Sequence, residues 1–134
     1  MKPQNMPSIH TGPLISLSMG ERGVISRILA TKYGGYLTFA AMSAGEASAP
    51  GQPSVSDMLN MYSSRTQTAS TKVYGIIGNP VSHSRSPVLH NASMQEKGFD
   101  GVYVPLLVDS LRTFVSEFTN TDWAGFSVTI PHKV

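Results

Sequence analysis

The chain has 134 residues, which suits one ordinary domain, and its hydrophobic share of 40% excludes a disordered tail. Its net charge is only +2 and the basic residues are scattered, so neither nucleic-acid binding nor charge-driven membrane binding is expected. There are no cysteines, and the four histidines lack metal-ligand spacing, so neither disulfides nor a metal site is expected. Charged residues make up only 13%, which fits a slice through larger domains better than a complete small one.

The first half alternates between strand-like and helix-like patterns. Residues 13–19 alternate as a half-buried strand does, and 24–33 follow a helical spacing that two glycines stop. Residues 36–42 are β-rich, and Ser54 and Asp57 have the spacing of a capping box at the start of a second helix. This order predicts βα units on a parallel sheet, with the two strands as parallel neighbours.

A polar, aperiodic segment at 63–71 separates this pattern from the next one and predicts an interdomain linker. The chain is therefore divided into residues 1–62, the linker 63–71, and residues 72–134. No apolar run in either half has the length of a membrane span, and the first six residues lack the features of a signal or transit peptide.

The second half restarts the strand and helix alternation. Ser86 is the predicted N-cap of its first helix, with Pro87 at the first helical position. The predicted elements are strand 72–78, helix 86–97, strand 102–108, helix 111–118 and strand 123–130.

Three residues of the first half are candidates for substrate contacts. Ser48 and Gln52 lie in a small polar loop after a strand, the side of a β/α barrel that faces its active site. The guanidinium of Arg27 could bind a carboxylate with two parallel hydrogen bonds. An ordinary connecting loop and a solvated arginine are the alternative interpretations, and they are the commoner ones.

Two clusters of the second half are further candidates. Ser84 and Ser86 lie between a strand and a helix N-terminus, which attracts anions, although plain helix capping explains them equally well. Ser127, Thr129 and Lys133 lie at the carboxyl end of a strand, where ligands of open α/β sheets bind. A lysine there can move a proton, although an exposed lysine is more often only solvated.

The motif Gly78-Asn79-Pro80-Val81-Ser82-His83-Ser84-Arg85-Ser86-Pro87, then His90-Asn91, then Ser127 to Lys133 resembles the opening of shikimate dehydrogenases. The resemblance covers residues 72–134. It implies that Ser84 and Ser86 bind the substrate carboxylate, that Thr129 touches substrate, and that Lys133 acts in acid/base catalysis. Ser127 stands where many members have Asn, a substitution that resembles the fused plant enzymes.

Residues 13–62 resemble the end of type I 3-dehydroquinate dehydratases. The similar motifs are Met19-Gly20, Gly23 to Arg27, the 36–39 strand and the Ser48 to Gln52 loop. The resemblance implies that Arg27, Ser48 and Gln52 bind dehydroquinate. It also implies an α/β fold in two incomplete parts: the last units of a (β/α)8 barrel, followed by the start of the dehydrogenase substrate-binding domain.

The order of the two parts resembles the fused plant enzyme of the shikimate pathway. The resemblance implies a bifunctional enzyme that acts on 3-dehydroquinate, 3-dehydroshikimate and shikimate, uses NADP and resides in the plastid stroma. The family's Schiff-base lysine and proton-transfer histidine are expected before Met1, and its catalytic aspartate and glycine-rich NADP loop after Val134. The chain alone is therefore expected to be inactive.

Two alternatives remain open from the sequence. A quinate-preferring paralogue of the same dehydrogenase family would differ in polar pocket contacts that the motifs do not separate. A non-catalytic truncated gene product would carry the same motifs without activity. A reading frame that extends in both directions would favour the enzyme, and a genuine stop after Val134 would favour the truncated product.

Overall fold

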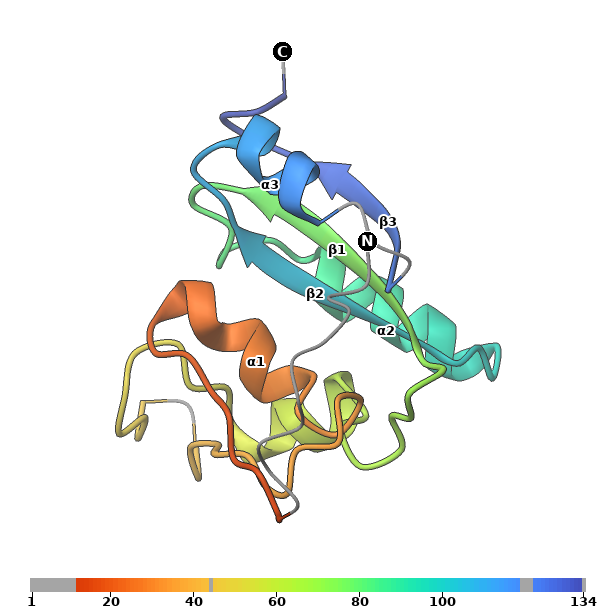
Figure 1. The fold of residues 1–134 in the computed structure, drawn as a ribbon. Coiled ribbons are helices and arrows are strands. Elements are labelled where there is room, and N and C mark those ends of the chain that lie inside the picture. Colours follow the sequence, from red (N-terminus) through yellow and green to blue (C-terminus); the bar gives the residue numbers. More distant parts are fainter. Residues whose placement is uncertain (1–11, 44, 119–121, 134) are drawn as a thin grey trace.

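The computed structural model describes residues 12–43, 45–118 and 122–133. Its second half forms a sheet with helices on both faces, and its first half packs against that sheet (Figure 1). Within the described ranges, none of the helices has the length and apolar character needed to cross a membrane. The elements are η1 (Glu21–Gly23), α1 (Val24–Ile28), η2 (Asp57–Met61), β1 (Lys72–Gly78), α2 (Ser86–Glu96), β2 (Gly101–Leu107), α3 (Leu111–Glu117) and β3 (Trp123–Val128).

The three strands form one parallel sheet in the order β2-β1-β3. The central strand β1 is nearly all apolar, as expected for a parallel strand covered on both faces. The register places Ile77 opposite Leu106 on one side and opposite Val128 on the other. The predicted strands 72–78, 102–108 and 123–130 are thus confirmed to within two residues at each end.

Side chains of β1 and β2 alternate between two apolar layers. Val73 and Val104 belong to the larger layer, which also contains residues of α1 and α3. Ile76 and Tyr103 belong to the smaller layer, which includes Met94 of α2. Complete burial of a valine or isoleucine side chain contributes roughly 1.5 to 3 kcal/mol, so the larger layer is the main source of stability.

Helix α2 is fixed to the sheet by a buried amide. Asn91 is 2% exposed, and its Nδ2 donates to the carbonyl of Tyr103 at 2.8 Å while its Oδ1 accepts the N–H of Tyr103 at 2.8 Å. Both groups of the amide are therefore satisfied in the interior. This pair of bonds sets the position of α2, whose N-terminus carries the two candidate serines.

The predicted strands 13–19 and 36–42 are not present, so the expectation that they pair in parallel is wrong. A strand needs a ladder of hydrogen bonds to a neighbour. Between these two segments the described residues share one backbone bond, from Tyr36 N to Leu14 O at 2.9 Å. A single isolated parallel bridge joins Ala41 to Ser54 instead. The first half is consequently a set of short helices and irregular connections.

Of the two helices predicted in the first half, the first is shorter than predicted and the second begins at the predicted cap. The first was expected over 24–33, but α1 ends at Ile28 and continues as irregular turns to Gly34, whose φ is +74°. The Ser54 half of the predicted capping box is confirmed, because Ser54 Oγ accepts the N–H of Asp57 at 3.0 Å. The Asp57 carboxylate accepts the Ser54 hydroxyl at 2.8 Å, where a full capping box would bind the Ser54 backbone N–H.

Candidate functional site

The carboxyl ends of β1 and β3 lie side by side and bring the two dehydrogenase-like motifs to one edge of the sheet. Thr129 N donates to Ile77 O at 2.8 Å, which extends the pairing past the end of β3, and Asn79 N donates to Ile130 O at 3.0 Å. A methyl group added at Gly78 would lie 2.5 Å from Thr129 Cγ2. Only glycine therefore allows Thr129 to approach β1 this closely.

Ser84 and Ser86 lie together at the start of α2. Ser84 Oγ accepts the N–H of Ser86 at 3.2 Å, and both side chains are half-buried. The expectation that Ser86 is the N-cap is wrong, because it is the first helical residue and no side chain bonds from the N-cap position, Arg85. Ser84 caps the backbone from two residues away, which leaves the Ser86 hydroxyl uncommitted among the described contacts.

Ser127 is joined to a residue that the sequence patterns did not single out. The hydroxyls of Ser127 and Tyr103 share a short hydrogen bond between β3 and β2. The Tyr103 ring is 5% exposed and lies 4.4 Å from the ring of His90 on α2, measured between centroids. The only sequence signal was the place of Tyr103 in the middle of an apolar strand, which indicates burial and says nothing of a polar partner.

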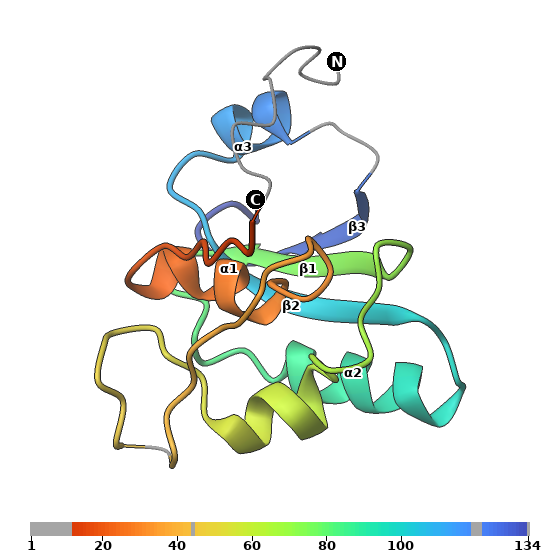
Figure 2. The same ribbon diagram turned by 60° about the horizontal axis from the view of Figure 1, so that its bottom comes forward.

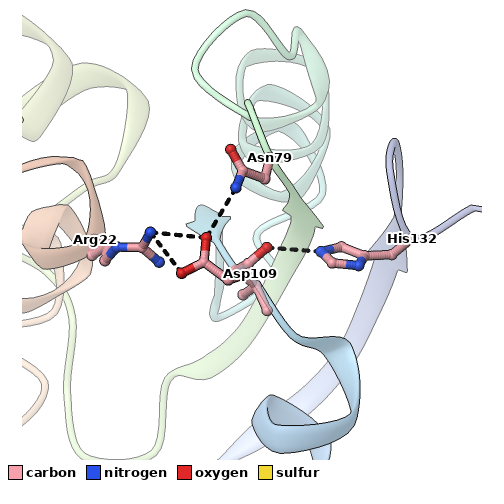
Figure 3. Close-up of polar contacts among 5 residues, drawn as sticks. Arg22, Asn79, Asp109 and His132 are labelled. Atoms are coloured by element: carbon pink, nitrogen blue, oxygen red, sulfur yellow. Dashed lines mark hydrogen bonds and ion pairs between the residues drawn. The ribbon is translucent and has the colours of Figure 1, made fainter.

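Lys133 is exposed at the end of the segment that follows β3, and no hydrogen bond links it to Ser84, Ser86 or Thr129 among the described residues. Its neighbour His132 is anchored, since its Nε2 lies 2.7 Å from Val108 O, just after β2 (Figure 3). A carbonyl only accepts, so Nε2 carries the proton in this contact. His132 thereby ties the Lys133 segment to the sheet.

An ion pair crosses the same region and joins the two halves (Figure 3). Arg22 Nη2 lies 2.7 Å from Asp109 Oδ2 and donates to Oδ1 at 2.9 Å, while Asn79 Nδ2 donates to that Oδ1 at 3.0 Å. The hydrogen bond from Arg22 lowers the pKa of Asp109 below its ordinary value, and the same contact raises the pKa of Arg22. The partners are 87 residues apart, so no local pattern predicts the pair.

In the first half, Ser48 and Gln52 lie together in one loop. Gln52 Oε1 accepts the backbone N–H of Ser48 at 2.9 Å and its hydroxyl at 3.1 Å. The loop packs on the turn before η1, because a methyl group at Gly51 would lie 2.3 Å from Gly20 O. Gly51 also has a φ of +72°, which other residues rarely adopt.

Arg27 is buried in the first half and is not in contact with that loop through any hydrogen bond among the described residues. It is 2% exposed, its Nη2 faces Met19 Sδ at 3.5 Å, and its Nε has no hydrogen-bond partner. Burying a guanidinium whose N–H has no hydrogen-bond partner costs folding free energy, unless an anion or polar group accepts that hydrogen bond. The interpretation of Arg27 as a solvated surface residue is therefore wrong.

Two neighbouring cavities open between the halves. One has a volume of about 360 Å³ and includes Gln52 and Asp57, and the other has about 420 Å³ and includes Ser84 and His83. They share five lining residues: Met61, Tyr62, Val81, Ser82 and Pro105. Burial raises the pKa of the Tyr62 phenol to about 12, which keeps that phenol neutral. The other four shared residues carry no charge. No cluster of three or more potential metal ligands occurs in the part of the chain that the structure describes.

Each half of the chain matches a known protein family. Residues 4–69 match the type I 3-dehydroquinase family, and residues 76–134 match the shikimate dehydrogenase substrate binding domain. The two matches are adjacent, do not overlap and together take in nearly the whole chain.

Two curated relatives and one solved structure are similar to this chain. A bifunctional 3-dehydroquinate dehydratase/shikimate dehydrogenase of Arabidopsis thaliana, described as chloroplastic, is 55% identical over 90% of this chain and 20% of its own. A shikimate dehydrogenase (NADP(+)) of Trichormus variabilis is 47% identical over 49% of this chain and 24% of its own. A solved dehydroquinate dehydratase and shikimate dehydrogenase from S. pombe is 27% identical, with a TM-score of 0.44, over 92% of this chain and 23% of that one.

The chain thus spans about a fifth to a quarter of the length of these relatives. It belongs to the type I 3-dehydroquinase family through its first half and to the shikimate dehydrogenase substrate-binding family through its second, joined in the order of the bifunctional enzymes.

Proposed function

We propose that the chain is part of a bifunctional shikimate-pathway enzyme that dehydrates 3-dehydroquinate and reduces the resulting 3-dehydroshikimate to shikimate. The observation that carries this proposal is the shared sheet edge: the Thr129 N to Ile77 O bond places the serine motif and the Thr129–Lys133 motif after neighbouring parallel strands. Ligands of open parallel sheets bind at that edge. The family matches name the substrates to be tested there.

In the dehydrogenase half, Ser84 and Ser86 bind the substrate carboxylate through their hydroxyls. The Ser86 hydroxyl has no other partner among the described residues, and both serines stand at the N-terminus of α2, which favours an anion. Thr129 and Ser127 contact the ring hydroxyls. Lys133 moves the proton of the hydroxyl that is oxidised or formed, and its exposed ammonium is free to turn toward the substrate.

NADP is the proposed redox partner, since relatives of the second half carry it in their names, and when bound it takes up or supplies the hydride. The chain contains no G-x-G-x-x-G loop, so none of its residues is assigned to the nucleotide.

In the dehydratase half, Arg27, Ser48 and Gln52 position dehydroquinate. The Ser48–Gln52 pair offers a hydroxyl and an amide side by side, and Arg27 has an unmet donor. These groups can bind and orient a polyhydroxylated acid but none of them is a nucleophile for a ketone. The covalent step therefore needs the lysine that the family resemblance places before this chain.

The proposed location is the plastid, because the Arabidopsis relative is described as chloroplastic. An enzyme made from the complete reading frame around this chain tests the function directly. It should convert 3-dehydroquinate to shikimate when NADPH is supplied. Conversion of quinate in preference to shikimate would favour the paralogue instead, and no reaction with any of these substrates would contradict the proposal.

A further inference from the structure

One apolar core crosses the boundary between the two family parts. Ile28 and Met58 of the dehydratase part are 0% and 3% exposed, and they belong to the same cluster as Val104 and Leu106 of the dehydrogenase part. Helix α1 contacts β2 directly, so it forms part of the layer over one face of the sheet. The core of the second part is therefore completed by the first.

A hydrogen-bonded cap adds specificity to this packing. The Gln95 amide of α2 donates from Nε2 to Asn60 O at 2.9 Å, to Met61 O at 3.0 Å and to Ser63 Oγ at 2.9 Å. These carbonyls end η2, and the last carbonyls of a helix lack partners within it. Figure 2 shows this helix, drawn yellow-green, beside α2. A residue of one family part thus caps a helix of the other.

Two further polar contacts hold the boundary. The Arg22–Asp109 pair joins η1 to the loop after β2. Lys32, only 6% exposed, donates from Nζ to Ala69 O at 2.8 Å and so fixes the segment that connects the parts. That segment has three buried polar side chains, Ser64, Gln67 and Thr71, between exposed residues, so it is fastened to the fold at separate points.

We propose that these contacts form a specific interface between the two family parts. Because of this interface, the two parts fold and unfold as one cooperative unit. The inference goes beyond the proposed function, and it needs no catalysis. Small domains unfold in an all-or-none manner when their parts share a core. Two independently folded domains joined by a linker would unfold separately.

The position of Trp123 allows a sharp test in the chain itself. It is the only tryptophan, it lies in β3, and its ring packs against Phe114, Phe118 and Phe126 of the dehydrogenase part. Its fluorescence during urea unfolding therefore reports when β3 and its aromatic neighbours unfold, and the ring also borders Ile25 and Leu29 of the first part across a shared cavity. Ile28→Val, in the first part, should raise the unfolding constant seen by Trp123 about twofold to tenfold, and Ile28→Ala at least about thirtyfold.

Met42→Ala is the matched control, because Met42 also lies in the first part but is 82% exposed and should leave the Trp123 transition unchanged. If Ile28→Ala does not fold, loss of the native Trp123 signal supports the interface, and Ile28→Val still measures it. Gln95→Ala should lower the Trp123 midpoint and speed hydrogen exchange of the Ser64 amide. An unchanged Trp123 midpoint in both Ile28 variants would overturn the proposal.

Discussion

Arg22 binds Asp109 across the boundary of the two family parts, with 2.7 Å between Nη2 and Oδ2. Both side chains are more than half exposed, so the pair adds little to stability by itself. Its importance lies in where it stands. Asp109 also accepts a hydrogen bond from the side chain of Asn79, which follows β1. The residue before Asp109 is Val108, whose carbonyl accepts the hydrogen bond from His132. The pair therefore joins the dehydratase half to the edge that carries the candidate shikimate residues.

The first prediction concerns the titration of Asp109. Arg22→Gln should raise the Asp109 pKa toward its ordinary value, because it removes the hydrogen bond and positive charge that lower that pKa. Since the folded pKa is depressed, the pair stabilises the fold above the ordinary carboxyl pKa, and this contribution disappears as the pH falls through the folded pKa. Carbon-detected NMR titration of the Asp109 carboxyl measures the shift. An unchanged pKa in Arg22→Gln would show that the pair does not persist in solution.

Gly78→Ala should destabilise the chain by roughly 1 to 3 kcal/mol, as overpacking does, because the added methyl group would lie 2.5 Å from Thr129 Cγ2. Urea unfolding followed by Trp123 fluorescence measures this change. Gly125→Ala is the matched control, since its nearest neighbour would be Tyr74 at an ordinary 3.5 Å. Equal effects of the two substitutions would contradict the close contact between β1 and Thr129.

Asn91→Ala should cost about 2 to 4 kcal/mol, because it leaves the buried N–H and C=O of Tyr103 without their partners. The same unfolding measurement applies. Asn60→Ala serves as the comparison, since the Asn60 side chain is exposed and, within the described part of the chain, bonds only to Ser56 Oγ. It should change stability by less than about 0.5 kcal/mol. A loss below about 1 kcal/mol in Asn91→Ala would mean that α2 is not anchored in this way.

The sequence patterns predicted the second half well, for a physical reason. Its strands β1 and β2 are mostly apolar and Pro87 marks a helix start, so the signals are local. Strands 13–19 and 36–42 were predicted wrongly, because a strand depends on partners as well as on its own alternation. The Tyr103–Ser127 bond and the Gln95 cap join residues more than 20 positions apart and have no local signal.

The isolated chain should give no covalent adduct when borohydride is added with 3-dehydroquinate. In the dehydratase half the structure describes one lysine, Lys32, and its Nζ is buried and bonded to Ala69 O. A Schiff base needs an accessible neutral amine. Intact-mass spectrometry with and without substrate is the measurement. A stoichiometric adduct on Lys32 would mean that the chain carries its own dehydratase nucleophile.

Ser84→Ala should mainly weaken shikimate binding in the enzyme made from the complete reading frame. Loss of one hydrogen bond to a charged carboxylate corresponds to roughly 1.5 to 3 kcal/mol and should appear chiefly in KM. Ser93→Ala is the control, since Ser93 lies on the same helix α2 but is exposed and its hydroxyl donates to Leu89 O, away from the cavity. If Ser84→Ala and Ser93→Ala behaved alike, the carboxylate assignment would fail.

Steady-state kinetics of Lys133→Ala in that complete enzyme test the central claim most directly, because proton transfer is the one chemical step assigned to this chain. Removal of a general acid or base slows turnover by a factor of about 100 to 10,000. The account predicts a loss of that size in kcat for shikimate oxidation, with KM much less affected. A variant with unchanged kcat and a raised KM would contradict it and leave Lys133 as a charge that only positions the substrate.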